Sequence, residues 1–243
     1  MISSADGHDS HAEADALRSL HHKFLPEVID ILETAEGTAI VMEYVRGKSL
    51  EQILQENERL SYESVLQLGL QLCDVLEYLH TRPHSILHLD LKPANILIRR
   101  DGRPVLIDFG ASETEGHERK KRMGSDGYAA PEQYVPGTKL SVKTDLYALA
   151  AVMYTSLTGE VYSREESRKK IPGCPSWLDE ILSCCMSEEP GDRPGNARVL
   201  RRMLLHGRKI YGREQMRKNF WAALILMLAA LGIAGHAMGI SGR

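Results

Sequence analysis

Residues 87–97, LHLDLKPANIL, place a carboxylate, an ammonium and an amide at short intervals among apolar residues. Asp90, Lys92 and Asn95 are poor core residues, so we expect a loop that a packed scaffold holds for chemistry. A carboxylate can receive a hydroxyl proton, and an ammonium can neutralise the charge that builds on a transferred phosphoryl group. An amide oxygen is a hard ligand for a cation. The stretch therefore predicts a catalytic loop.

A second acid, Asp108, follows in IDFG after two short apolar runs that flank the turn signal RDGRP. This pattern predicts a hairpin over residues 95–110, which would return the chain so that Asp108 approaches Asn95. Two oxygen ligands in that arrangement suit Mg²⁺, which is typically held by one or two protein groups plus substrate phosphates. Each motif alone is compatible with an ordinary capped turn. In this order and spacing, they indicate phosphate chemistry.

Other patterns predict the elements that must hold this loop. Residues 12–20 suggest a helix, and two β-branched runs in residues 28–45 suggest a hairpin. Ser61 is a suitable N-cap for a long one-sided helix that follows it, and residues from 140 onward are again helical in pattern. The apolar positions that define the long helix are Val65, Leu68, Leu72, Val75, Leu76 and Leu79.

The composition is that of a globular protein without a general attraction to polyanions. The 243 residues are 43% hydrophobic and 26% charged, and the formal net charge is −3. No run of Lys and Arg in the main body is interleaved with aromatic residues, so we expect no nucleic-acid partner.

The C-terminal region departs from this composition. Residues 220–240 run for about 20 positions without a charge, which is enough to cross a hydrocarbon layer of ~30 Å as a helix. Residues 201–218 carry seven Lys and Arg against one acid, Glu214. The positive-inside rule then predicts a single-pass cell-membrane protein with a cytoplasmic body, and Trp221 would mark the interface. The alternative is a buried C-terminal helix of the globular body.

The motifs together resemble the protein kinase family over roughly residues 11–205. HLDLKPANIL is similar to the catalytic loop, DFG to the metal-binding turn, and YAAPEQY to the segment that closes the activation loop. The resemblance implies Asp90 as the base, Lys92 as the phosphate partner, and Asn95 with Asp108 as Mg²⁺ ligands. Lys92 and Ser125 are typical of the serine/threonine branch, which implies ATP and a protein Ser or Thr hydroxyl as substrates.

The same resemblance assigns a nucleotide pocket. IVMEYV is similar to the hinge that takes the adenine edge through backbone groups, which would place Met42 at the back of the pocket, Glu43 to Val45 along it and Leu97 beneath the adenine. Glu13 occupies the place of the helix acid that grips a Lys beside the phosphates.

Three further residues match structural positions of the family. Glu132 resembles the acid that pairs with Arg193 of GDRP, and Asp145 resembles the buried acid that braces the catalytic loop.

The implied fold is an α+β, protein-kinase-like fold of the bacterial serine/threonine type, with a mostly helical C-lobe and an incomplete N-lobe. The domains would be an N-lobe remnant at 1–45, a C-lobe at 46–206, a basic juxtamembrane segment at 207–219 and a transmembrane helix at 220–240. The Gly-rich loop and the VAIK strand of the family do not occur in these 243 residues. We therefore expect the upstream coding sequence to supply them, and we expect the truncated chain to be weak or inactive.

A second departure concerns regulation, because Leu89 stands where the family has an Arg that reads an activation-loop phosphate. We expect activation not to depend on that contact. Two functions remain open: a membrane-tethered serine/threonine kinase, or a catalytically inactive kinase-like module that binds a partner. Retention of Asp90, Lys92, Asn95 and Asp108 favours the kinase.

Overall fold

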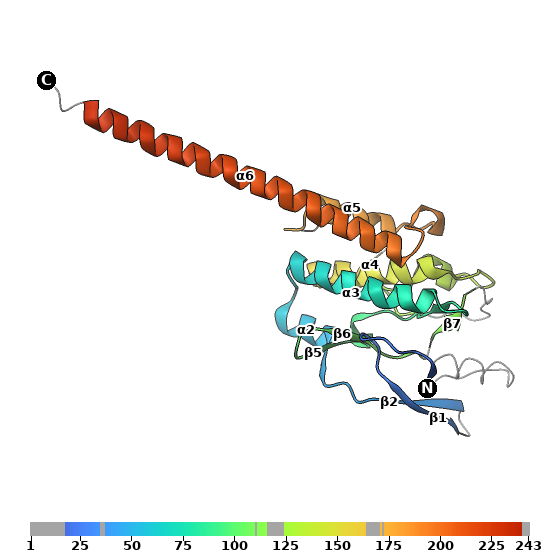
Figure 1. The fold of residues 1–243 in the computed structure, drawn as a ribbon. Coiled ribbons are helices and arrows are strands. Elements are labelled where there is room, and N and C mark those ends of the chain that lie inside the picture. The colour runs from blue at the N-terminus through green and yellow to red at the C-terminus, as the bar shows by residue number, and fades with distance from the viewer. Residues whose placement is uncertain are drawn as a thin grey trace. The chain divides into compact units, whose positions relative to one another are not determined.

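A computed structural model of the chain describes residues 18–34, 37–109, 111–115, 124–163, 171 and 173–239 (Figure 1). The helix predicted for residues 12–20 lies almost wholly outside the described residues, and so does Glu13. Residues up to 204 form one compact unit, and residues from 205 onward form a second.

The first described element is the predicted hairpin. Strand β1 (Val28–Thr34) pairs antiparallel with β2 (Gly37–Met42), and a register irregularity lies between Val28 and Asp30. The hairpin ends at Met42, three residues earlier than the predicted limit of 45. Beyond Met42, a connector of irregular backbone leads to the next strand.

The hairpin predicted for 95–110 is confirmed, and it belongs to a sheet of three strands. Strand β5 (Ile96–Arg99) pairs antiparallel with β6 (Pro104–Leu106) and, on its other side, with β3 (Gly47–Ser49). The sequence pattern does not predict β3, because a three-residue strand carries almost no periodicity. Gly47 is required there, since a Cβ at this position would collide with the carbonyl oxygen of Ile98.

Local capping starts the next two helices. Helix α2 (Leu50–Asn57) begins with a capping box, in which the side chains of Ser49 and Gln52 each accept a backbone N–H from the other residue. Helix α3 (Tyr62–His80) begins at the predicted N-cap, Ser61. All six apolar positions that defined this helix are buried, so α3 lies in the core as predicted.

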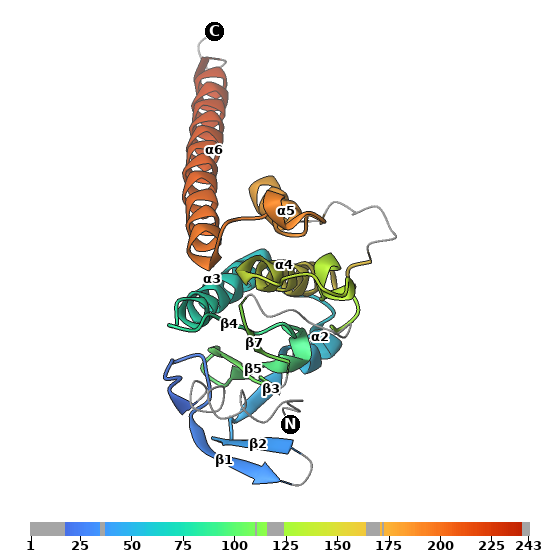
Figure 2. The ribbon, with the colours of Figure 1, turned by 90° about the vertical axis from the view of Figure 1, so that its right-hand side faces the viewer.

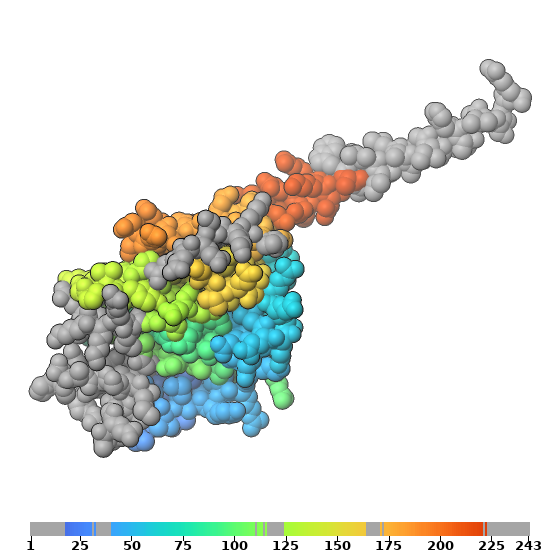
Figure 3. Space-filling model, turned by 180° about the vertical axis from the view of Figure 1, so that it is seen from behind, coloured from blue at the N-terminus to red at the C-terminus, as the bar shows by residue number. Residues whose placement is uncertain are grey.

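Helix α4 (Val142–Thr158) packs beside α3, and both lie on the same side of the small sheets (Figures 1 and 2). Nearly every residue of α4 is buried, which explains its weak amphipathic pattern. In the space-filling view, the connector and the coloured part of the hairpin (blue) lie below the cyan residues of α2 and the start of α3 (Figure 3). The remaining elements are β4 (Ile86–Leu87), η1 (Pro93–Asn95), β7 (Glu113–Thr114), η2 (Pro131–Tyr134), α5 (Ser176–Cys185) and η3 (Pro190–Asp192).

The last helix, α6, is continuous from Ala197 to Gly239, whereas the sequence pattern predicts a basic segment at 207–219 that separates the C-lobe from a helix at 220–240. Gly207 and Gly212 lie inside α6 without interrupting it. A helix tolerates an isolated glycine at a cost of about 1 kcal/mol. Within the part of the chain that the structure describes, no helix has the length and hydropathy needed to cross a bilayer. The membrane helix predicted for 220–240 is therefore not supported by the structure, and most of its side chains lie outside the described residues.

Candidate active site

The side chains of Asp90, Lys92 and Asn95 lie together, as the sequence pattern predicted. Asn95 Nδ2 donates to the main-chain oxygen of Asp90 at 2.9 Å and to its Oδ2 at 3.1 Å. Lys92 Nζ lies 2.8 Å from the same Oδ2. Residues 93–95 form the 3-10 turn η1, which brings Asn95 back over Asp90. The Asn95 amide and the Lys92 ammonium thus both hold Asp90 Oδ2.

Ser125 completes this cluster from a distant part of the chain. Its hydroxyl donates to Asp90 Oδ1 at 2.8 Å and accepts from Lys92 Nζ at 2.9 Å. In the sequence, Ser125 indicates only the serine/threonine branch of the family, and no local pattern places it against Asp90. The contact shows that the Asp90 carboxylate can hold a serine hydroxyl at hydrogen-bonding distance.

Asp145 braces the backbone of the catalytic loop, as the resemblance implied. Its two carboxylate oxygens accept the backbone N–H groups of His88 and Leu89, each at 2.9 Å, and Nε2 of His80 lies 2.7 Å from Oδ2. Burial by itself would raise the pKa of Asp145, but its hydrogen bonds and the charges near it, those from His80 first, together outweigh burial and lower the pKa below its usual value. Asp145 is therefore a buried carboxylate, and His80 and the loop supply its partners.

Gln133 holds the other side of Leu89. Its Nε2 donates to the carbonyl of Leu89 at 2.9 Å, while its Oε1 accepts from the backbone N–H of Ala130. Leu89 has a φ of 62°, a conformation that non-glycine residues adopt at a cost of about 1–3 kcal/mol. Asp145 thus holds the backbone N–H of Leu89 in place, and Gln133 holds its carbonyl. Sequence reasoning missed Gln133, because nothing in its neighbourhood signals a partner 44 residues away.

The Leu89 side chain packs into the protein and does not face a phosphate. It is buried with Leu87 and Leu140, and Val142 packs against this cluster. A packed apolar cluster of this kind does not stabilise the charge of an arginine or a phosphate. Position 89 thus contributes an apolar side chain to the core, and independence from an activation-loop phosphate stays a prediction.

His88 links the catalytic loop to the segment that carries Asp108. Its Nε2 donates to the carbonyl of Ile107 at 3.2 Å, and its ring lies edge-on to Phe109, with 5.3 Å between the ring centres. Burial lowers the pKa of His88, although the charge of Asp145 and, to a smaller extent, those of Asp90 and Asp108 oppose this shift. His88 is thus a neutral link between the loop and the segment that carries Asp108.

The β5–β6 hairpin brings Asp108 beside Asn95 as predicted. The backbone N–H of Ile107 donates to the carbonyl of Asn95 at 2.9 Å, and Asp108 follows with an exposed side chain and a φ of 66°. Because the Asn95 amide nitrogen is used on Asp90, its Oδ1 is the atom available to a cation. Two such oxygen donors fit a divalent ion that also binds phosphates. The described residues contain no cluster of three His, Cys, Asp or Glu residues that could hold a metal by themselves.

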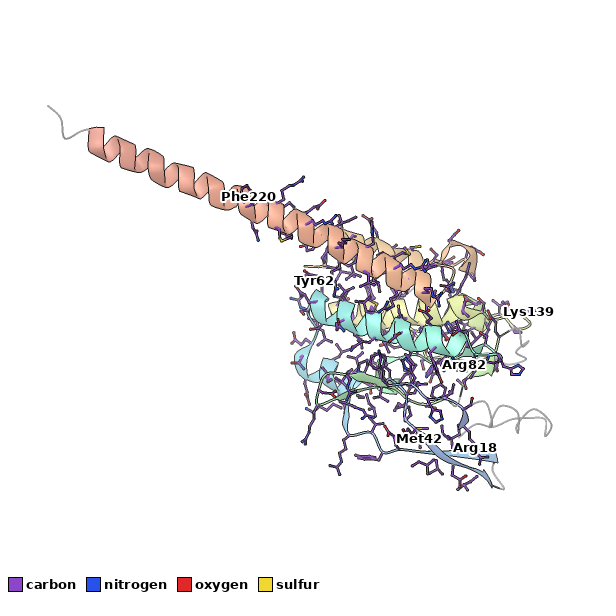
Figure 4. All side chains as sticks on the ribbon, viewed as in Figure 1. Arg18, Met42, Tyr62, Arg82, Lys139 and Phe220 are labelled. Atoms are coloured by element: carbon purple, nitrogen blue, oxygen red, sulfur yellow. The ribbon has the colours of Figure 1, made fainter. Side chains whose placement is uncertain are left out.

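The residues predicted for the nucleotide pocket lie at the end of β2, in the connector that follows it and in β5. Met42 lies at the end of β2 (Figure 4) and lines an apolar pocket with residues from the segment before β1 and with Phe109. Val45 is buried, whereas Glu43 is half-buried. Leu97 is half-buried in β5, between Ser49 of β3 and Val105 of β6, and it does not line this pocket.

The predicted pair of Glu132 and Arg193 is confirmed. Arg193 donates to both Glu132 carboxylate oxygens, at 2.7 and 2.9 Å, and Thr144 Oγ1 donates to Glu132 Oε1 at 2.9 Å. The side chains are 0% and 7% exposed for Arg193 and Glu132. This pair joins η2, which carries Gln133, to the segment before α6.

Comparisons with known proteins agree with this geometry. The family described as "Protein kinase domain" matches residues 2–205. A probable serine/threonine-protein kinase of Clostridium perfringens is 33% identical over 209 residues, which cover 77% of this chain and 30% of the relative. The probable serine/threonine-protein kinase PknB of Lactococcus lactis is 31% identical over 153 residues, or 61% of this chain and 24% of the relative.

A plant relative shows the same pattern. The serine/threonine-protein kinase RUNKEL of Arabidopsis thaliana is 36% identical over 189 residues, covering 76% of this chain and 13% of the relative. The chain thus spans less than a third of the length of each of these relatives. With a family match over most of its length and the cluster around Asp90 in place, this chain belongs to the protein kinase family.

Proposed function

We propose that the chain transfers the γ-phosphoryl group of ATP to a serine or threonine hydroxyl of a protein substrate. The observation that carries this proposal is the hydrogen bond from the Ser125 hydroxyl to Asp90 Oδ1. An incoming substrate hydroxyl has the same chemistry as Ser125 and can take its place at that oxygen. The family match and the serine/threonine-protein kinase relatives support the same assignment.

In the proposed reaction, the substrate oxygen forms a bond to the γ-phosphorus while the bond from this phosphorus to the bridging oxygen of ADP breaks. Asp90 orients the hydroxyl and receives its proton. The Lys92 ammonium, 2.8 Å from Asp90 Oδ2, is placed to offset negative charge on the transferred group. Asn95 and Asp108 would hold Mg²⁺, which neutralises phosphate charge when bound. The base of the nucleotide would lie along Glu43 to Val45, with Met42 behind it and Leu97 beneath it.

The test is phosphate transfer from radiolabelled ATP to a generic protein substrate and to the chain itself. Asp90→Asn should lower kcat by about 10²- to 10⁴-fold, because the base is lost while the shape is kept. Asp101→Asn, in the exposed turn between β5 and β6, is the matched control and should act like the unaltered chain. Transfer that survives Asp90→Asn would show that Asp90 is not the base.

One observation favours the alternative, a kinase-like module that binds a partner without catalysis. Both carboxylate oxygens of Asp90 already have partners within the chain, namely Asn95 and Lys92 on Oδ2 and Ser125 on Oδ1. Ser125→Ala separates the two functions. For a kinase, this change alters the KM for the protein substrate or kcat. A binding module would show no transfer in either form.

A separate proposal, resting on the sequence alone, is attachment of the chain to the cell membrane by residues 220–240 with the body in the cytoplasm. Its support is the uncharged run and the basic segment at 207–219 that precedes it. The test is extraction of membranes with alkaline carbonate after expression of the full chain. Chain that remains in the pellet supports a spanning helix, whereas release into the supernatant refutes it.

A further inference from the structure

We propose that the ion pair between Glu43 and Arg99 is a clasp that fixes the connector 43–46 and thereby sets the position of the nucleotide base. This inference rests on the proposed function, in which the connector takes the adenine. The Glu43 carboxylate accepts from the Arg99 guanidinium, and the two residues are 56 positions apart in the chain. Arg99 would then be a positioning residue, acting on the nucleotide through the connector.

Arg99 holds the connector at both of its ends. Its side chain binds Glu43, the first residue after β2, and its backbone is paired with Gly47, the first residue of β3. Because Gly47 has no Cβ, β3 can approach β5 closely at this point. The residues between, 44–46, are therefore closed into a short loop with both ends fixed to one arginine.

The closed loop carries two backbone groups, a carbonyl and an amide, that a nucleotide base could bind. The Glu43 N–H donates to the carbonyl of Glu27 at 2.9 Å, which fixes the start of the connector. Among the residues that the structure describes, no backbone–backbone hydrogen bond uses the Glu43 carbonyl or the Val45 amide. A carbonyl and an amide two residues apart can pair with one acceptor–donor edge of a purine. The clasp fixes the backbone that carries both groups.

The pair is partly withdrawn from water, with 34% of the Arg99 side chain and 33% of the Glu43 side chain exposed. Arg99 Nε is buried and has no partner within the described chain. Removal of either charge therefore leaves the other charge half-buried and without its counter-charge. The neighbouring Arg100 is exposed, and it provides a matched control of the same residue type one position away.

The first measurement is hydrogen exchange of the Glu43 amide, which is bonded to the carbonyl of Glu27, and it requires no nucleotide. Arg99→Gln should speed this exchange by about two- to fivefold, as expected for the loss of one partly exposed pair. Arg100→Gln should leave the exchange rate unchanged. The exchanged pair, Glu43→Arg with Arg99→Glu, should restore slow exchange. Equal exchange in Arg99→Gln and the unaltered chain overturns the clasp.

The second measurement is the affinity for a fluorescent, non-hydrolysable ATP analogue. Arg99→Gln should weaken this affinity by about two- to fivefold, and in turnover the loss should appear in the KM for ATP rather than in kcat. An effect of equal size in Arg100→Gln would overturn the clasp. If the unaltered chain binds no analogue, the proposed function fails, while hydrogen exchange still decides the clasp.

Arg99→Lys guards against a folding defect. It keeps the positive charge, so exchange and affinity should stay nearer to those of the unaltered chain than to those of Arg99→Gln. Thermal melting by circular dichroism identifies any variant that fails to fold. If Arg99→Lys and Arg99→Gln behave alike while both are folded, the charge of Arg99 does not hold the connector and the proposal is wrong.

Discussion

Glu132→Gln is expected to destabilise the first unit strongly, because it leaves the Arg193 charge buried without its counter-charge. The Arg193 side chain is 0% exposed, and its other hydrogen-bond acceptors are the carbonyls of Ser187, Lys143 and Glu188. Those neutral groups satisfy its N–H donors but do not neutralise it. Breaking a buried pair from one side typically costs 3–5 kcal/mol. Since glutamine keeps one acceptor oxygen, we expect the lower end, about 3 kcal/mol.

The assay is urea unfolding followed by far-ultraviolet circular dichroism. With an m value of about 2–3 kcal/mol/M, a loss of this size lowers the midpoint by about 1 M or more while m is unchanged. Glu189→Gln, at an exposed neighbouring position, should change the free energy of unfolding by less than about 0.5 kcal/mol. The double change Glu132→Gln with Arg193→Met should recover part of the loss. A loss below about 1 kcal/mol in Glu132→Gln would refute the reasoning.

Three further changes test other parts of the structure. The pKa of His88 is lowered in the folded chain, so the unfolded chain binds a proton first, and the free energy of unfolding should fall as the pH drops below about 6.5. Urea midpoints measured from pH 8 to pH 5 test this expectation. His88→Phe should make the midpoint depend less on pH, whereas the control His84→Gln, at an exposed position, should not. Ser49→Ala removes the cap of α2 and should cost about 1 kcal/mol in the same titration. Gln133→Met leaves the carbonyl of Leu89 without its side-chain donor and should cost about 1–3 kcal/mol, seen as a lower melting temperature; an unchanged Tm would mean that Gln133 does not hold the loop.

The elements around the site could be predicted where the signal is local. The hydroxyl of Ser61 caps the next turn of its own helix, and the buried face of α3 follows from a repeat of three and four residues. The turn RDGRP sets the β5–β6 hairpin, which brings Asp108 to Asn95. Each of these features depends on residues a few positions apart.

The family resemblance supplied the long-range pairs that such patterns do not reveal. Asp145 against the catalytic loop and Glu132 against Arg193 were both expected from it, and both are present. The resemblance also placed Leu97 beneath the nucleotide base, and this placement stays a prediction; Leu97 is not among the residues that line the small apolar pocket at Met42. The uncharged run at 220–240 was predicted as a separate helix, whereas the backbone continues α6 without a break.

By itself the sequence determined which residues carry the chemistry and which short elements present them. Asp90 and Asn95 are five positions apart, so a single turn is enough to join them. Only the tertiary structure decided that Ser125 reaches Asp90, that Gln133 holds Leu89 and that Glu43 meets Arg99. The physical reason is that these partners are 35 to 56 positions apart. Their contacts arise when packed helices and paired strands close the intervening loops, and no local pattern records that outcome.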